Sequence, residues 1–113
     1  MTSRITFFIN LSVVIMKKEH NYWVYIVSSN NKLIYIGVTN NIRRRYKEHW
    51  LRITPGFTQK YNCCNLVYFE HFKYINDAIA REKQLKRWRR EKKVALIEKN
   101  NPTWKNLVLE WED

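Results

Sequence analysis

The chain has 113 residues, enough for one domain with a single modest core. Twenty-one Lys and Arg against ten Asp and Glu give a formal charge of +11, which favours a polyanion or an anionic membrane surface as partner and also fits a merely basic soluble protein. The two cysteines, Cys63 and Cys64, are adjacent, which excludes a disulfide framework and a four-ligand zinc site and indicates a reducing cytosol.

The segment before Met16 is largely apolar but short. Residues 5–15 form an apolar run far below the roughly 20 residues that span a bilayer. The run ends in Met-Lys-Lys-Glu without the small-residue cleavage site of a signal peptide. We therefore expect residues 1–15 to be an upstream extension outside the fold, residues 16–113 to form a single domain, and no association with a membrane.

Two strands follow in sequence. Residues 22–27 are β-branched or aromatic throughout, which predicts a strand buried on both faces. Residues 28–31 have turn composition and residues 32–37 form a second apolar strand, so the pair should be a β-hairpin. If the register puts their faces on the same side, the phenols of Tyr25 and Tyr35 become neighbours.

A basic helix is predicted next, capped by Asn40 or Asn41 and ending near Trp50. Arg45 and His49 are unexpected on its sheet-facing stripe, because burying such groups costs several kcal/mol unless a partner is present. The stripe at spacing i, i+3, i+4, i+7 consists of Ile42, Arg45, Tyr46 and His49, while Arg43, Arg44 and Lys47 point away, as a solvated face that can also touch phosphates.

A loop and a third strand come after this helix. Thr-Pro-Gly at positions 54–56 opens a loop to about residue 63, in which Lys60 is exposed enough to contact a ligand. Residues 65–72 have the alternating and β-branched composition of a strand.

A second helix should run from a cap at Asn76 or Asp77 to about Trp88. Its apolar stripe, which includes Leu85, also contains the carboxylate of Glu82. Two interpretations of Glu82 are open: an ion pair with Arg45 or another base, or a metal ligand.

The last helix is predicted from Arg89 or Arg90 to about Asn100. Residues 81–93 hold eight bases against two acids, which suits a phosphate backbone and equally suits a solvated surface. Four large apolar residues in the tail should pack back on the domain: Trp104, Leu107, Leu109 and Trp111. Nucleic-acid contacts are expected from Arg43, Arg44, Lys47, Lys60, Lys83, Lys86, Arg87, Arg89 and Arg90.

A spaced set of residues resembles the GIY-YIG nuclease family, in particular its small stand-alone bacterial members, over about residues 21–104. The set comprises Val24-Tyr25, Tyr35-Ile36-Gly37, Arg45, His49 and Glu82. The resemblance implies a mixed α/β fold in which about three helices flank a three-stranded antiparallel sheet. The chain departs from the family pattern at Trp23, where the first motif has glycine, and at Val38, where a lysine often stands. A family asparagine after the glutamate has Asn100 or Asn101 as possible counterparts.

The resemblance also implies roles for individual residues. Tyr25 and Tyr35 would be the paired tyrosines, with Gly37 allowing the backbone to bend close to the site. Arg45 would lie beside the scissile phosphate, His49 would assist proton transfer, and Glu82 would bind one Mg²⁺ or Mn²⁺ ion. These roles describe a metal-dependent DNA endonuclease; the alternative is a catalytically inactive nucleic-acid-binding module on the same fold.

The general base is the least determined role. A phenol with a pKa of about 10 is roughly 0.1% ionised at pH 7, so Tyr35 as base costs about 4 kcal/mol unless cations lower that value. We expect Tyr35 to be part of the base system, with neutral His49 or a water activated by the metal ion as alternatives. With one small domain, we expect structure-directed or weakly specific nicking of DNA, branched or damaged, by a cytoplasmic monomer or weak dimer.

Overall fold

The computed structural model describes residues 20–51 and 65–111. The expectations for residues 1–15, for the loop with Lys60 and for the adjacent cysteines lie outside these ranges. The elements are β1 (Tyr22–Ser28), β2 (Ile34–Thr39), α1 (Ile42–Trp50), β3 (Asn65–Phe72), α3 (Ile75–Arg87), α4 (Arg90–Asn100) and a short 3₁₀ turn, η1 (Leu107–Glu110).

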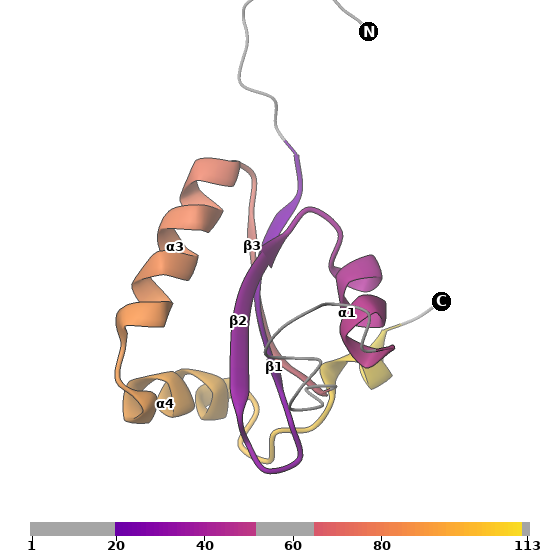
Figure 1. Ribbon diagram of the computed structural model, residues 1–113, viewed down its shortest axis with the longest axis vertical. Coiled ribbons are helices and arrows are strands. Elements are labelled where there is room, and N and C mark those ends of the chain that lie inside the picture. Colours follow the sequence, from indigo (N-terminus) through magenta and orange to yellow (C-terminus); the bar gives the residue numbers. More distant parts are fainter. Residues whose placement is uncertain (1–19, 52–64, 112–113) are drawn as a thin grey trace, which may run out of the picture.

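The three strands form one antiparallel sheet in the order β2-β1-β3, as expected (Figure 1). Its central strand is β1, which pairs with a neighbour on each side and is covered on both faces. Its residues from Val24 to Val27 are at most 2% exposed, which accounts for the continuous apolar sequence of this strand.

The hairpin between β1 and β2 differs from the prediction at the start of β2. The strand begins at Ile34 rather than Lys32, because Lys32 has a φ of 65° and belongs to the turn. Ser29 closes the turn: its backbone bonds Leu33 and Lys32, and its hydroxyl accepts from the Leu33 amide at 3.1 Å.

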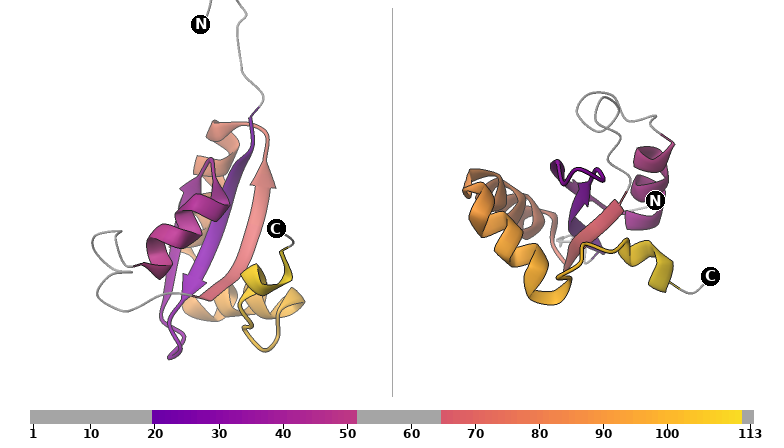
Figure 2. Two further views of the ribbon diagram at one scale, coloured as in Figure 1. Left: turned by 90° about the vertical axis from the view of Figure 1, so that its right-hand side faces the viewer. Right: turned by 90° about the horizontal axis from the view of Figure 1, so that it is seen from below.

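Helices lie on both faces of the sheet (Figure 2). On one face α3 and α4 pack over a core that includes Val24, Ile26 and Ile36. On the other face α1 and η1 cover a smaller core that includes Tyr25 and Val27. Since side chains alternate along a strand, β1 contributes consecutive residues to opposite cores.

Two local predictions were wrong. Helix α3 begins at Ile75, and its N-cap is Tyr74, which makes no side-chain capping bond. Asn76 and Asp77 therefore lie in the first turn instead of capping it. The negative charge of Asp77 there interacts favourably with the positive end of the helix dipole. In the tail, Trp104 is buried and Leu107 and Trp111 pack against the α1-side core, but Leu109 is 81% exposed. None of the helices in the described ranges combines the length and apolar character needed to cross a membrane.

Candidate active site

The register of the hairpin brings the two motif tyrosines to one face of the sheet. Tyr25 is paired with Gly37, and Val27 with Tyr35, so Tyr25 and Tyr35 are two residues apart on the same face. Their ring centroids are 6.4 Å apart. Tyr25 is 2% exposed, whereas Tyr35 is only partly buried.

Gly37 is required by the position of the Tyr25 ring. A Cβ atom at Gly37 would lie 2.4 Å from Tyr25 Oη and 2.6 Å from its Cζ, closer than any real contact. Gly37 is a regular strand residue opposite Tyr25. Its structural role is therefore to leave space for the phenol, whereas the family resemblance implied a bend of the backbone.

Helix α1 carries the two basic residues, Arg45 and His49, that form hydrogen bonds with Tyr25. Its N-cap is Asn41, whose side chain accepts from the Arg44 amide at 3.0 Å. Arg45 and His49, one helical turn apart, both face the sheet. Arg45 Nε donates to Tyr25 Oη at 3.1 Å, and His49 Nε2 lies 2.8 Å from the same oxygen. This hydrogen-bonded group, which we call the Tyr25 triad, joins Tyr25, Arg45 and His49.

His49 is enclosed by the two tyrosines. Its ring centroid is 5.4 Å from that of Tyr25 and 5.3 Å from that of Tyr35, and its side chain is fully buried. Its Nδ1 atom is buried and has no hydrogen-bond partner among the described residues. Two neutral tautomers fit: with the proton on Nδ1, Tyr25 donates to Nε2; with the proton on Nε2, Tyr25 Oη accepts from both His49 and Arg45.

Burial shifts the titration of the triad. It raises the pKa of Tyr25 to about 12, although the hydrogen bond from Arg45 acts in the opposite direction. Burial, followed by the nearby charge of Arg45, lowers the pKa of His49 to about 4. Burial also lowers the pKa of Arg45, but hydrogen bonds to Tyr25 and Glu48 outweigh this and raise it above its usual range. At pH 7 the triad holds a neutral phenol, a neutral imidazole and a guanidinium.

Glu48 is a participant that the sequence reasoning missed. Its Oε1 accepts from Arg45 Nη1 at 2.9 Å, and its Oε2 is 3.7 Å from Arg44 Nε. The i, i+3 spacing of Arg45 and Glu48 on a predicted helix was the available signal. Glu48 therefore supplies the negative partner that offsets the free-energy cost of placing a guanidinium against the sheet.

Glu82 is not part of this group. It is carried by α3, which packs on the opposite face of the sheet from α1 (Figure 1). The side chain is 19% exposed and its carboxylate pairs with Lys86 Nζ at 2.9 Å. The ion pair anticipated for Glu82 is thus made with Lys86, one turn away, while Arg45 pairs with Glu48.

The predicted nucleic-acid contacts that fall in the described ranges lie in two separate regions. Those on α1 are on the opposite side of the sheet from those on α3 and α4 (Figure 2). Several have structural partners: the Arg43 guanidinium lies 4.8 Å from the Trp111 ring centroid, and Arg90 Nη2 donates to the Lys32 carbonyl at 2.8 Å. Arg44 Nη2 donates to Asn40 Oδ1 at 3.2 Å. Lys83 and Arg87 line a hollow beside Trp88, Lys86 pairs with Glu82, and Arg89 is the N-cap of α4.

Asn101 has a structural role. It is 3% exposed, and its amide donates to the carbonyls of Val67 and Lys105 and accepts from the Lys105 amide. It thereby fixes the turn after α4 on β3. These bonds use both N–H donors of the side-chain amide and bond its oxygen to the Lys105 amide, in a buried position.

The model of the GIY-YIG catalytic domain matches residues 21–95, which include every member of the Tyr25 triad. The chain belongs to the GIY-YIG family. Members of this family are typically nucleases, which makes a nucleic acid the expected substrate of this GIY-YIG domain.

The chain is also similar to several small proteins, and the matches cover most of their length. The GIY-YIG chain is 35% identical over 77 residues to a UPF0213 protein of Haloquadratum walsbyi, covering 68% of this chain and 86% of that protein. It is also 35% identical over 75 residues to a UPF0213 protein of Clostridium perfringens, covering 66% and 81%. The solution NMR structure of a UPF0213 protein from Bacillus halodurans is similar, with a TM-score of 0.51, 27% identity and coverage of 76% and 92%.

The carboxylate proposed as a metal ligand, that of Glu82, is not part of a larger cluster of ligands among the described residues. No three His, Cys, Asp or Glu side chains cluster in the described ranges. Mg²⁺ in phosphate-processing sites commonly uses one or two carboxylates and completes its shell with water and phosphate oxygens. The partly exposed Glu82 fits this donor chemistry, provided that its bond to Lys86 opens.

Proposed function

We propose that the protein is a divalent-metal-dependent DNA endonuclease that nicks DNA with structural or weak sequence preference. The observation that carries the proposal is the Tyr25 triad: a guanidinium held on a buried phenol that also contacts a neutral imidazole. A plain nucleic-acid-binding surface needs exposed cations, and it does not need a fully buried histidine bonded to a buried tyrosine. A cytoplasmic monomer or weak dimer is the form we propose.

Arg45 supplies positive charge to the scissile phosphate. Its guanidinium has five N–H donors, more than its bonds to Tyr25 and Glu48 use, and its position is fixed before substrate arrives. Donors fixed in advance stabilise the negative charge that develops on non-bridging oxygens in the transition state. The role of Tyr25 follows from the same contact: it is the anchor that orients Arg45.

Tyr35 is the better candidate for the base system. With a pKa of about 12, Tyr25 as base costs about 7 kcal/mol at pH 7. Tyr35 is the more accessible phenol, and its ring lies beside neutral His49. His49 is fully buried, so it acts on protons only through its neighbours and is a positioning residue.

Glu82 would hold the Mg²⁺ or Mn²⁺ ion. When bound, the ion would neutralise charge on the phosphate and the leaving oxygen. Because Glu82 and Arg45 lie on opposite faces of the sheet, this role requires the DNA backbone to pass around the β2 edge, where the first turn of α3 approaches Arg45. The chain would contribute the Glu82 carboxylate as a ligand. In the structure this carboxylate forms an ion pair with Lys86, which would have to open for the ion to bind.

The deciding experiment compares wild type with Arg45→Ala and Glu82→Ala on plasmid, branched and single-stranded DNA with Mg²⁺ or Mn²⁺. We expect wild type to nick at least one of these DNAs, and each variant to lose about 100-fold or more in rate. Lys105→Ala and Glu91→Ala are matched controls, because each changes the charge by the same amount as the variant it matches, but neither residue belongs to the Tyr25 triad or to the predicted nucleic-acid contacts.

Each alternative has its own outcome. If wild type binds DNA but nicks none of the substrates with either metal, the chain is the inactive binding module. If nicking needs no metal and Glu82→Ala leaves it unchanged, the metal role of Glu82 is wrong while the Tyr25 triad keeps its role.

A further inference from the structure

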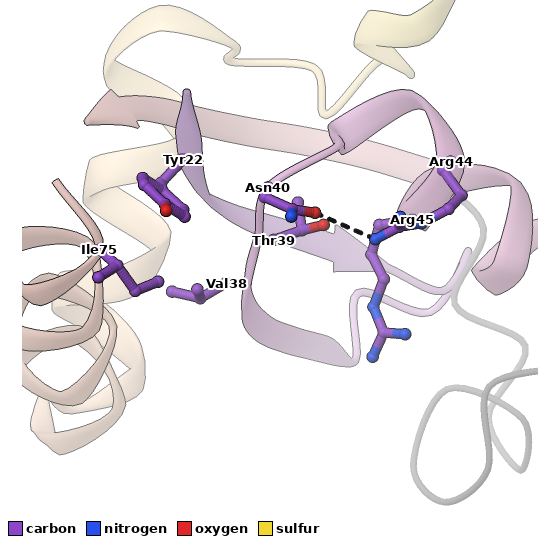
Figure 3. A pocket seen from close by; sticks show the side chains of 7 residues that line it. All are labelled: Tyr22, Val38, Thr39, Asn40, Arg44, Arg45 and Ile75. Carbon is purple, nitrogen blue, oxygen red and sulfur yellow. Dashed lines mark hydrogen bonds between the residues drawn. The ribbon is translucent and has the colours of Figure 1, made fainter. Parts of the chain in front are cut away.

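A hollow beside Arg45 is lined by side chains of two opposite kinds. Its volume is about 300 Å³, and it lies where β2 ends and α1 begins. Figure 3 shows Tyr22, Val38 and Ile75 on one side, Arg44 and Arg45 on the other, with Thr39 and Asn40 between them. We call it the Tyr22 hollow.

The basic side of the hollow is continuous with the proposed active site. Arg45, which bonds Tyr25, also lines the Tyr22 hollow. Arg44 is held toward the hollow because its Nη2 donates to Asn40 Oδ1 at 3.2 Å (Figure 3). Arginines are well suited to phosphate oxygens, so a group bound here would have its phosphate on the Arg45 side.

The apolar side offers an aromatic ring and aliphatic neighbours. Tyr22 is partly exposed and Ile75 is 38% exposed, so both present surface to a ligand. An aromatic side chain that faces a cavity can stack on any of the four nucleobases, because each base has an aromatic face. Tyr22 and Asn40 also line a second hollow with His20 and Asn21, which extends the surface along the start of β1.

We infer that the Tyr22 hollow is a subsite for one unpaired nucleotide next to the scissile phosphate, with its base on Tyr22 and its phosphate on Arg44 and Arg45. The inference rests on the proposed nuclease function and specifies its substrate class. A base within a continuous duplex is stacked on both neighbours and cannot offer a face to Tyr22 without leaving the helix. The preferred DNA therefore contains a bulge, flap or other unpaired nucleotide.

The test measures binding without cleavage. Wild type is titrated, in EDTA, into three DNAs of one sequence: a full duplex, the same duplex with a single bulged 2-aminopurine, and the single strand. We expect the bulged duplex to bind about tenfold more tightly than the full duplex, with a change in 2-aminopurine fluorescence on stacking. Tyr22→Leu should abolish both effects, and Tyr22→Phe should keep them because it retains the ring.

A charge-matched pair of variants separates the hollow from general electrostatics. Arg43 and Arg44 are neighbours on α1, but Arg43 contacts Trp111 and Arg44 lines the hollow. Arg44→Gln should reduce the preference for the bulged duplex, while Arg43→Gln should weaken binding of all three DNAs equally. If Tyr22→Leu fails to fold by circular dichroism, the Arg44→Gln result and the wild-type fluorescence decide.

The outcomes distinguish this subsite from the proposed function. Equal binding of bulged and full duplexes by wild type, with unchanged fluorescence, overturns the subsite even if all DNAs are nicked with Mg²⁺. A preserved preference for the bulge with no nicking under any condition overturns the nuclease function and leaves the subsite in place.

Discussion

At the scale of single residues, the contact between Tyr25 and Gly37 sets the geometry of the proposed site. The phenol lies over the glycine because no side chain intervenes, and from there its oxygen reaches Arg45 and His49. The dependence on glycine is steric. Any larger residue must move the ring whose oxygen holds the arginine.

The variant Gly37→Ala tests this dependence. We expect it to lower the free energy of unfolding by about 1–3 kcal/mol through overpacking, and to reduce the nicking rate about 100-fold through displacement of the Tyr25 ring. Chemical denaturation and initial rates measure the two effects. Ile36→Val, a neighbouring substitution in the core of the other face, should cost about 1 kcal/mol and leave the rate intact. Wild-type activity in Gly37→Ala would show that the ring position is unimportant.

His49 predicts a specific dependence of stability on pH. Its pKa falls from the ordinary 6.5 to about 4 in the folded chain, so between these values the unfolded chain binds more protons. The contribution of neutral His49 to the free energy of unfolding is therefore fully present above pH 6.5, and it is lost as the pH falls toward 4. We expect a slope of up to about 1.4 kcal/mol per pH unit in the free energy of unfolding across this window.

Denaturation of wild type and His49→Gln at several pH values measures this slope. The variant should be less stable at pH 7 and show a smaller slope between pH 6.5 and 4. His71→Gln is the control, since His71 is exposed and its Nε2 bonds Asn21 at the surface. Identical slopes in wild type and His49→Gln would mean that His49 is not held neutral by burial.

At the scale of elements, α1 places three polar side chains with one turn of helix. Arg45 faces the sheet, Glu48 anchors its guanidinium from the same helix, and His49 closes the buried side. Because the spacing is set by the helix itself, removal of Glu48 should release Arg45 without altering the fold.

Glu48→Ala should therefore lower the nicking rate about tenfold with little change in the substrate concentration at half-maximal rate. Glu48→Gln keeps an oxygen acceptor at this position and should retain most of the activity. Steady-state kinetics of both variants, with circular dichroism as a check on folding, measure the difference. Full activity in Glu48→Ala would mean that Arg45 is positioned without this bond.

Much of this arrangement could be predicted from the sequence, and the reasons are local. Continuous apolar composition indicated β1, and the unusual placement of Arg45 and His49 on a sheet-facing stripe indicated a buried polar group. What the sequence could not give was register and partner choice. The start of β2 depends on the left-handed conformation of Lys32, and the partner of Arg45 depends on which nearby carboxylate its helix presents.

The first residue of a helix and the position of a side chain relative to distant parts of the chain were harder to predict from the sequence. Asn76 and Asp77 have cap chemistry, yet α3 begins before them, because its first turn is fixed by packing rather than by a capping bond. The spacing of Glu82 along the chain does not reveal that α3 and α1 cover opposite faces of the sheet. Its functional role therefore stays a prediction, as do those of the other proposed site residues.

At the scale of the whole molecule, the excess of positive charge is distributed over both faces of the sheet. The basic residues of α1 lie on one side and those of α3 and α4 on the other (Figure 1). A nucleic acid that reaches both regions must pass around an edge of the sheet, and the Tyr22 hollow lies at the end of the edge strand β2.

DNA affinity should therefore depend steeply on salt. Each neutralised phosphate contributes about 0.9 to the slope of log K against log salt, so a single contact residue accounts for roughly one unit. We expect Lys83→Gln, in the α3 region, to reduce the slope by about one. Lys105→Gln should not, because Lys105 pairs with Glu110 near the chain end. Equal slopes for Lys83→Gln and wild type, from a KCl series of binding curves, would remove the α3 region from the interface.

The unequal covering of the two sheet faces has a consequence for local opening. Strand β1 is enclosed by both cores, so its amides should exchange slowly with solvent. Helix α1 has nine residues, of which Ile42 and His49 are buried, so it can detach at a lower free energy than the sheet can unfold. Detachment removes Arg45 and His49 from Tyr25 together. Heating should thus inactivate the protein before it melts, with exchange at α1 as the early sign.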